Sequence, residues 1–184
     1  MSWFLPRALS GFRRDRRGAT SIEFAMVGLP FFLLIGAVFE GTLLCMAQLT
    51  LDESLDQAAR QVFTGTFQKA ADGTDPSARL RNLMCGGRTV MYSCADLKIE
   101  VAVSASFAAI APRDPYDDQN KAIATGFGSA FACPTGNDVV VIRAVSTAPH
   151  IMPMNLSGRL IGQFKQMVSA TAVFQAEPYT NGKC

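Results

Sequence analysis

The chain has 184 residues, enough for one domain with a core plus a membrane anchor and too few for two large domains. Hydrophobic residues make up 49% of it and charged residues 17%, which is apolar for a soluble domain and predicts a membrane segment. The net charge of +2 is uneven, because residues 1–18 carry five arginines against Asp15. This pattern disfavours a nucleic-acid-binding arm, since no aromatic-interleaved basic patch follows it.

The basic N-terminal block ends at a glycine, and a short motif follows. Arg13 to Arg17 hold four arginines, Gly18 and Ala19 come next, and Glu23 lies five positions after the glycine. A basic segment ahead of an apolar one predicts a cytoplasmic N-terminus. We therefore interpret residues 1–18 as a basic cytoplasmic leader.

An apolar segment follows this motif. Residues 24–39 carry no charge, and the run reaches the roughly 20 residues of a membrane span only by continuing through Glu40. We predict a transmembrane helix over residues 19–48, retained rather than removed as a signal peptide. Pro30 predicts a kink or local unwinding. Glu40 has two interpretations, a solvated residue at the outer membrane boundary or a residue that packs between subunits.

The helical pattern continues past the membrane segment. Apolar residues recur at helical spacing from Leu51 to Val62, with charged and amide side chains on the other face. One helix is therefore expected from about Thr20 to about Thr64, ending near Gly65. Its second half is amphipathic, and we expect its apolar face to pack on a globular domain. We therefore predict that residues 49–184 comprise a helix extension plus a periplasmic α+β domain.

The remaining sequence predicts short helices and strands. Asp75 can cap a helix that starts at Pro76, and residues 139–142 are apolar on both faces, as in a central strand. In chain order we expect a helix to about Met84, a strand over Lys98–Phe107, a long connection over 108–136 with a short helix near Asn120–Thr125, a strand within Asn137–Ala148, a short helix over Pro153–Gln163 and a strand over Gln166–Glu177. This order predicts an α+β fold, a long transmembrane helix continuing into an amphipathic helix packed on a small antiparallel sheet, as in pilins.

Four of the five cysteines follow the apolar segment, which Cys45 lies within. An even number of cysteines on an exported side allows disulfides. Cys85 and Cys94 are the favoured pair, because they close a short loop, and Cys133 with Cys184 is then the remaining pair. Free thiols are the alternative.

The sequence contains no catalytic grouping that holds together. His150 is the single histidine, and an ordinary surface or packing role is expected for it. Asp117 and Asp118 are adjacent, so their side chains point apart, and no further ligand follows at calcium-loop spacing. No phosphate-binding glycine loop is present. We therefore expect no enzyme activity, no cofactor and no metal.

The N-terminal motif resembles a type IV prepilin processing site. The resemblance rests on Gly18 to Glu23, after an arginine-rich leader and before an apolar helix. It implies that a prepilin peptidase cuts between Gly18 and Ala19. It also implies an assembly role for Glu23, which would neutralise the new N-terminal amine of a neighbouring subunit.

A narrower resemblance is to the TadE/TadG-like proteins, pseudopilins of the tight-adherence (Flp-type) pilus system in bacteria. It rests on residues 14–25, Pro30, Glu40 and, more loosely, residues 172–179. It implies a minor pseudopilin of the inner membrane, with a periplasmic domain and possible association with the pilus. The implied partners are other pilins or pseudopilins and the inner-membrane pilus machinery. An uncleaved single-pass anchor presenting a periplasmic binding or scaffold domain is the alternative.

Overall fold

The computed structural model describes residues 18–87, 89–110, 114–151, 159–162, 164–179 and 184. Two compact units are present, one up to Phe39 and the other from Glu40 to Cys184. The expected leader lies outside the described residues, except for Gly18.

Helix α2 (Ala19–Phe63) is the longest element. Its helical pattern is continuous through Pro30, so the local unwinding expected there does not occur. The helix ends where predicted, because Gly65 adopts a left-handed conformation (φ +71°). A side chain at Gly65 would also come within 2.8 Å of the Tyr179 ring. The short helix α3 (Thr66–Lys69) follows this turn.

A four-stranded antiparallel sheet forms the body of the second unit. Its strands are β1 (Lys98–Ser104), β4 (Val139–Pro149), β6 (Lys165–Gln175) and β5 (Leu160–Ile161), in the order β1-β4-β6-β5. The central position of β4 confirms the prediction from its two apolar faces. Its register places Val139 opposite Gln175 and Pro149 opposite Lys165.

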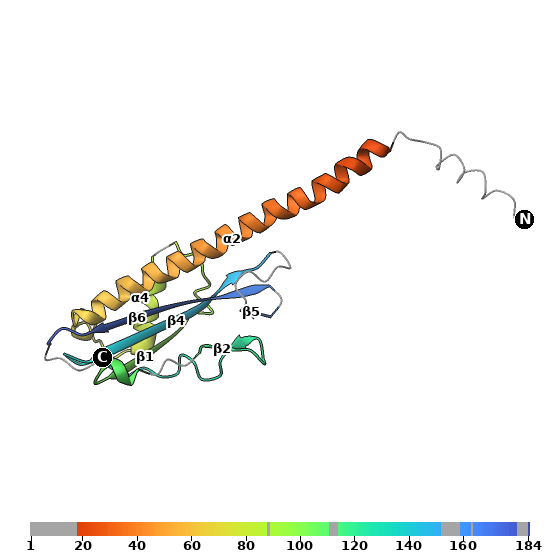
Figure 1. Cartoon of the computed structure of the whole chain (residues 1–184). Helices are drawn as coiled ribbons and strands as arrows, with labels where there is room; N and C mark the ends of the chain where they lie inside the picture. Colours follow the sequence, from red (N-terminus) through yellow and green to blue (C-terminus); the bar gives the residue numbers. More distant parts are fainter. Residues whose placement is uncertain (1–17, 88, 111–113, 152–158, 163, 180–183) are drawn as a thin grey trace, which may run out of the picture. The chain divides into compact units, whose positions relative to one another are not determined.

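The main core lies between one face of this sheet and two helices. These are the part of α2 from Glu40 onwards and α4 (Pro76–Cys85), whose predicted cap is confirmed, since Asp75 accepts hydrogen bonds from the backbone amides of Ser77 and Ala78. Figure 1 shows both helices beside β4 and β6. The fully buried side chains of this core include Leu51, Leu55, Val62, Phe67, Leu80, Met84, Leu97, Val101, Val140 and Ile142. The fold is therefore α+β, with a long N-terminal helix and a small antiparallel sheet.

A second, smaller cluster joins the sheet to a two-stranded hairpin. Strands β2 (Tyr116–Asp117) and β3 (Ala122–Ile123) pair with each other, and Tyr116 packs with Phe127, Val145 and Met167. This hairpin replaces the short helix expected near Asn120–Thr125, so that prediction is wrong. Asp117 accepts hydrogen bonds from the amides of Gln119 and Asn120, which turns the chain back on itself.

Two other sequence expectations need correction. The strand expected to reach Phe107 ends at Ser104, because Ser104 pairs with Val139, the first residue of β4, and no further partner follows. Residues 107–109 instead form a 3-10 helix, η1 (Phe107–Ala109). The helix expected over Pro153–Gln163 is also wrong at Leu160–Ile161, which form β5, while residues 152–158 and 163 lie outside the described residues.

Candidate functional site

The expected processing site lies at the start of α2. Gly18 is exposed directly before the helix, and its carbonyl oxygen accepts a hydrogen bond from the Ile22 amide at 3.2 Å. A methyl group added at Gly18 would meet nothing within 4 Å. Glu23 is exposed and lies four residues after Ala19, one turn further along the same helix face. Gly18 and Glu23 are thus both exposed.

The first half of α2 presents an apolar surface. Of the described helices, α2 is the one long and apolar enough to cross a membrane. Its large exposed hydrophobic side chains in this part are Ile22, Phe24, Met26, Val27, Leu29, Phe31, Phe32, Leu33, Leu34, Ile35, Val38 and Phe39. Pro30 is exposed among them. Such a surface fits a protein that crosses the membrane once.

Glu40 ends this apolar run and is buried in the domain. Only 2% of its surface is exposed, so the interpretation as a solvated boundary residue is wrong. Its Oε1 atom contacts Nδ1 of His150 and accepts a hydrogen bond from Nε2 of Gln166 at 3.3 Å. The Gln166 Nε2 atom also lies 2.7 Å from His150 Nδ1. The packing of Glu40 is therefore within the chain, against the ends of β4 and β6.

Sequence reasoning did not find this three-residue cluster. His150 was expected to have an ordinary surface or packing role, and it is 6% exposed. The partners lie 110 and 126 residues after Glu40, so no local pattern connects them. The one available signal was a carboxylate directly after an uncharged run of the helix, which requires a partner when it is buried.

Both disulfides join the pairs that the sequence favoured. Cys85, at the end of α4, bonds to Cys94, and Cys133 bonds to Cys184. Cys45 is exposed on α2 and outside both bonds. All four cysteines after the apolar segment therefore form disulfides.

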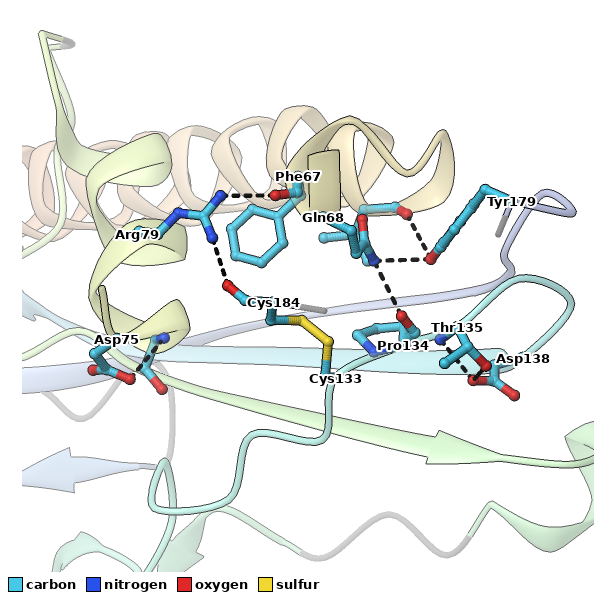
Figure 2. The surroundings of a disulfide bond; sticks show 12 residues. Phe67, Gln68, Asp75, Arg79, Cys133, Pro134, Thr135, Asp138, Tyr179 and Cys184 are labelled. Atoms are coloured by element: carbon cyan, nitrogen blue, oxygen red, sulfur yellow. Dashed lines mark hydrogen bonds between the residues drawn. A yellow bond between two sulfur atoms is a disulfide. The ribbon is translucent and has the colours of Figure 1, made fainter. Parts of the chain in front are cut away.

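An arginine connects the second disulfide to two helices (Figure 2). Arg79 of α4 donates a hydrogen bond to the backbone oxygen of Cys184 at 2.8 Å and another to that of Phe67 at 2.7 Å. Its guanidinium also lies 4.4 Å from the centre of the Phe67 ring. Residue 184 is therefore held by one covalent bond and one charged hydrogen bond.

A glutamine and a tyrosine extend this cluster (Figure 2). Gln68 donates a hydrogen bond to the Tyr179 hydroxyl at 2.8 Å and approaches the Pro134 oxygen at 3.4 Å. Burial raises the pKa of Tyr179, so its hydroxyl stays protonated and can donate to the Val62 oxygen at 3.4 Å. These contacts connect α3 to Pro134 and Tyr179, and Tyr179 to the end of α2.

Comparison with known families adds one finding. Residues 18–60 match the family model described as TadE-like protein. Over these residues the sequence is TadE-like, and we call them the TadE-like domain. No match is found among curated proteins or among solved structures.

The TadE-like domain begins at the residue expected to precede the cut. It runs from Gly18 to Arg60 and so covers nearly all of α2, including Glu23, Pro30 and Glu40. The sheet and both disulfides lie outside it. The likeness to TadE-like proteins thus rests on the long helix alone.

Proposed function

We propose that this protein is a minor pseudopilin that takes part in assembly of a tight-adherence, Flp-type type IV pilus, and that a prepilin peptidase matures it after Gly18. The observation that carries the proposal is a TadE-like domain that starts at Gly18, with an exposed carboxylate one helical turn past Ala19. The protein acts as a subunit and not as an enzyme, and it needs no cofactor or metal.

The proposed topology places the leader in the cytoplasm, one span in the bacterial inner membrane and the domain in the periplasm. The arginines before Gly18 support the orientation, since positively charged flanks remain in the cytoplasm. The two disulfides support the periplasm, because disulfides persist in oxidising compartments. Other pilins or pseudopilins and the inner-membrane pilus machinery are the proposed partners.

Glu23 has a defined role in this proposal. Cleavage gives Ala19 a positively charged amine, and both this amine and the Glu23 carboxylate would lie at the membrane. Each isolated charge costs several kcal/mol in lipid, and pairing offsets much of that cost. Glu23 of one subunit would therefore pair with the amine of the next subunit and favour assembly.

We predict that Gly18→Ala abolishes maturation, because a methyl group would crowd the peptidase site. The fold should not change, since a side chain at Gly18 meets nothing within 4 Å. Gly28→Ala is the matched control, because a methyl group there makes only ordinary contact with Phe24, at 3.7 Å. Mass spectrometry of membrane and sheared-surface fractions should find Ala19 as the first residue of the control and the full leader on Gly18→Ala.

The same measurement separates the alternative function. An intact leader on the unmodified protein, in cells with an active prepilin peptidase, would show an uncleaved single-pass anchor that presents a periplasmic binding or scaffold domain. Normal cleavage of Gly18→Ala would contradict the assignment of the cut site itself.

We predict that Glu23→Ala is cut normally but does not support pilus formation. The carboxylate is needed only to neutralise a neighbour's amine, so its loss should leave processing intact. Glu53→Ala is the matched control, because Glu53 is exposed on the same helix beyond the uncharged run. Pili counted by electron microscopy should be lost for Glu23→Ala and retained for Glu53→Ala; pili at normal numbers in Glu23→Ala cells would refute the role.

A further inference from the structure

Two large apolar side chains are exposed at one end of the sheet. Ile151 lies two residues after the end of β4 and Phe164 directly precedes β6, and their exposed fractions are 64% and 69%. They belong to adjacent strand ends, because the His150 amide donates a hydrogen bond to the Phe164 oxygen at 2.9 Å. Figure 1 shows β5 at this same end of the sheet. We call Ile151 and Phe164 the apolar tip.

The contacts of Glu40 with His150 and Gln166 place the apolar tip near the end of the uncharged run, residues 24–39. His150 precedes Ile151 and contacts Glu40, and Gln166, two residues after Phe164, also binds Glu40. Glu40 is the first charged residue after residues 24–39. We take the span to end at Glu40 and not at residue 48, because Glu40, Leu44 and Ala47 pack in the domain. The residues that hold Glu40 therefore lie at the boundary of the span too.

The length of the uncharged run strengthens this argument. Its sixteen residues extend about 24 Å as a helix, whereas the hydrocarbon core of a bilayer is about 30 Å thick. Glu40 therefore falls within a few ångströms of the core boundary, at a depth where an unpartnered carboxylate is costly. His150 and Gln166 cover it there, and the side chains beside them face the same environment.

We propose that the apolar tip inserts into the lipid surface at the point where α2 leaves the membrane. The inference rests on the membrane crossing proposed above. Apolar side chains at an interface bury their surface among headgroups and upper acyl chains. Residues 149–166 contain no aspartate or glutamate, so nothing in that segment repels anionic lipids.

The apolar side chains carry this contact, and the charges near them do not. Lys165 pairs with Asp96 at 2.6 Å and Arg159 pairs with Asp114 at 3.2 Å. Both cations are thus already neutralised within the domain. The tip therefore fits a lipid surface, and it contacts the apolar part of the lipids.

Tryptophan fluorescence in lipid vesicles tests the proposal on the full chain. Trp3, the single tryptophan, is first replaced by Phe. Phe164→Trp then reports on the tip. Phe107→Trp is the matched control, because Phe107 is 57% exposed and lies beyond Ser104, at the opposite end of the sheet, about 30 Å away along β4. Phe32→Trp, at a site that is 64% exposed within the uncharged run, reports on the membrane crossing itself.

Lipids brominated near the headgroup end of the acyl chain should quench Phe164→Trp at least about twofold more than Phe107→Trp. Phe32→Trp should be quenched most by bromines placed deeper. Equal quenching of Phe164→Trp and Phe107→Trp, with Phe32→Trp quenched, would overturn the tip contact and leave the proposed function standing. Absence of quenching in all three would overturn both, because α2 would then not cross the bilayer.

Discussion

Replacing His150 by alanine is expected to lower the free energy of unfolding of the domain by about 1–3 kcal/mol, the usual cost of removing one partner from a buried hydrogen-bonded pair. The Glu40 carboxylate would then be left in the core with Gln166 as its remaining partner in this cluster. Urea denaturation of the full chain in mild detergent, followed by circular dichroism, measures the loss. Glu53→Ala is the control, since Glu53 is exposed on the same helix and should cost less than about 0.5 kcal/mol.

A double-mutant cycle shows whether the loss belongs to the pair. Glu40→Ala should cost about as much as His150→Ala, and the double variant should cost less than the sum, because the two side chains share one interaction. Glu40→Gln should cost less, since an amide oxygen still accepts the bond from Gln166. Additive losses would show that the Glu40–His150 contact contributes no coupling.

Removal of the Cys133–Cys184 bond is the second large effect. A crosslink over a separation of 51 residues restricts the unfolded chain by roughly 4 kcal/mol on a loop-entropy estimate. The Cys133→Ser/Cys184→Ser variant should also release the backbone oxygen that Arg79 holds. We expect a loss of about this size in the same denaturation measurement.

The other disulfide supplies the comparison. Cys85 and Cys94 are only 9 residues apart in sequence, so their bond should contribute less, roughly 3 kcal/mol on the same estimate. Cys45→Ser is the control, because Cys45 is exposed and forms no disulfide, and its effect should stay within about 0.5 kcal/mol. A larger loss from the short loop than from the long one would contradict the entropic explanation.

The parts of the fold that could be predicted from the sequence are those set by local chemistry. The end of α2 follows from the left-handed conformation that Gly65 tolerates, and the start of α4 follows from Asp75 as a cap and Pro76 in the first turn. The central strand follows from side chains that are apolar on both faces. The segment from Gly18 to Glu23 was recognised for the same reason, since its spacing is short and fixed.

The parts that could not be predicted depend on distant partners. Phe107 continues the alternation of β1, yet the strand ends earlier because β4 has no residue left to pair with Ala105. The role of His150 depends on Glu40, which lies 110 residues earlier. Periodicity describes which face a residue occupies, but it does not describe what lies opposite that face.

The burial of Glu40 has a practical consequence for preparing the domain in water. Hydropathy alone suggests removing the whole expected span, through Gln48. Such a truncation would discard Glu40, Leu44 and Ala47, all of which pack against the domain, and would leave His150 buried without its carboxylate. A fragment that starts at Glu40 keeps these contacts and discards the exposed apolar surface, so it is the shortest version of the domain that preserves its own core.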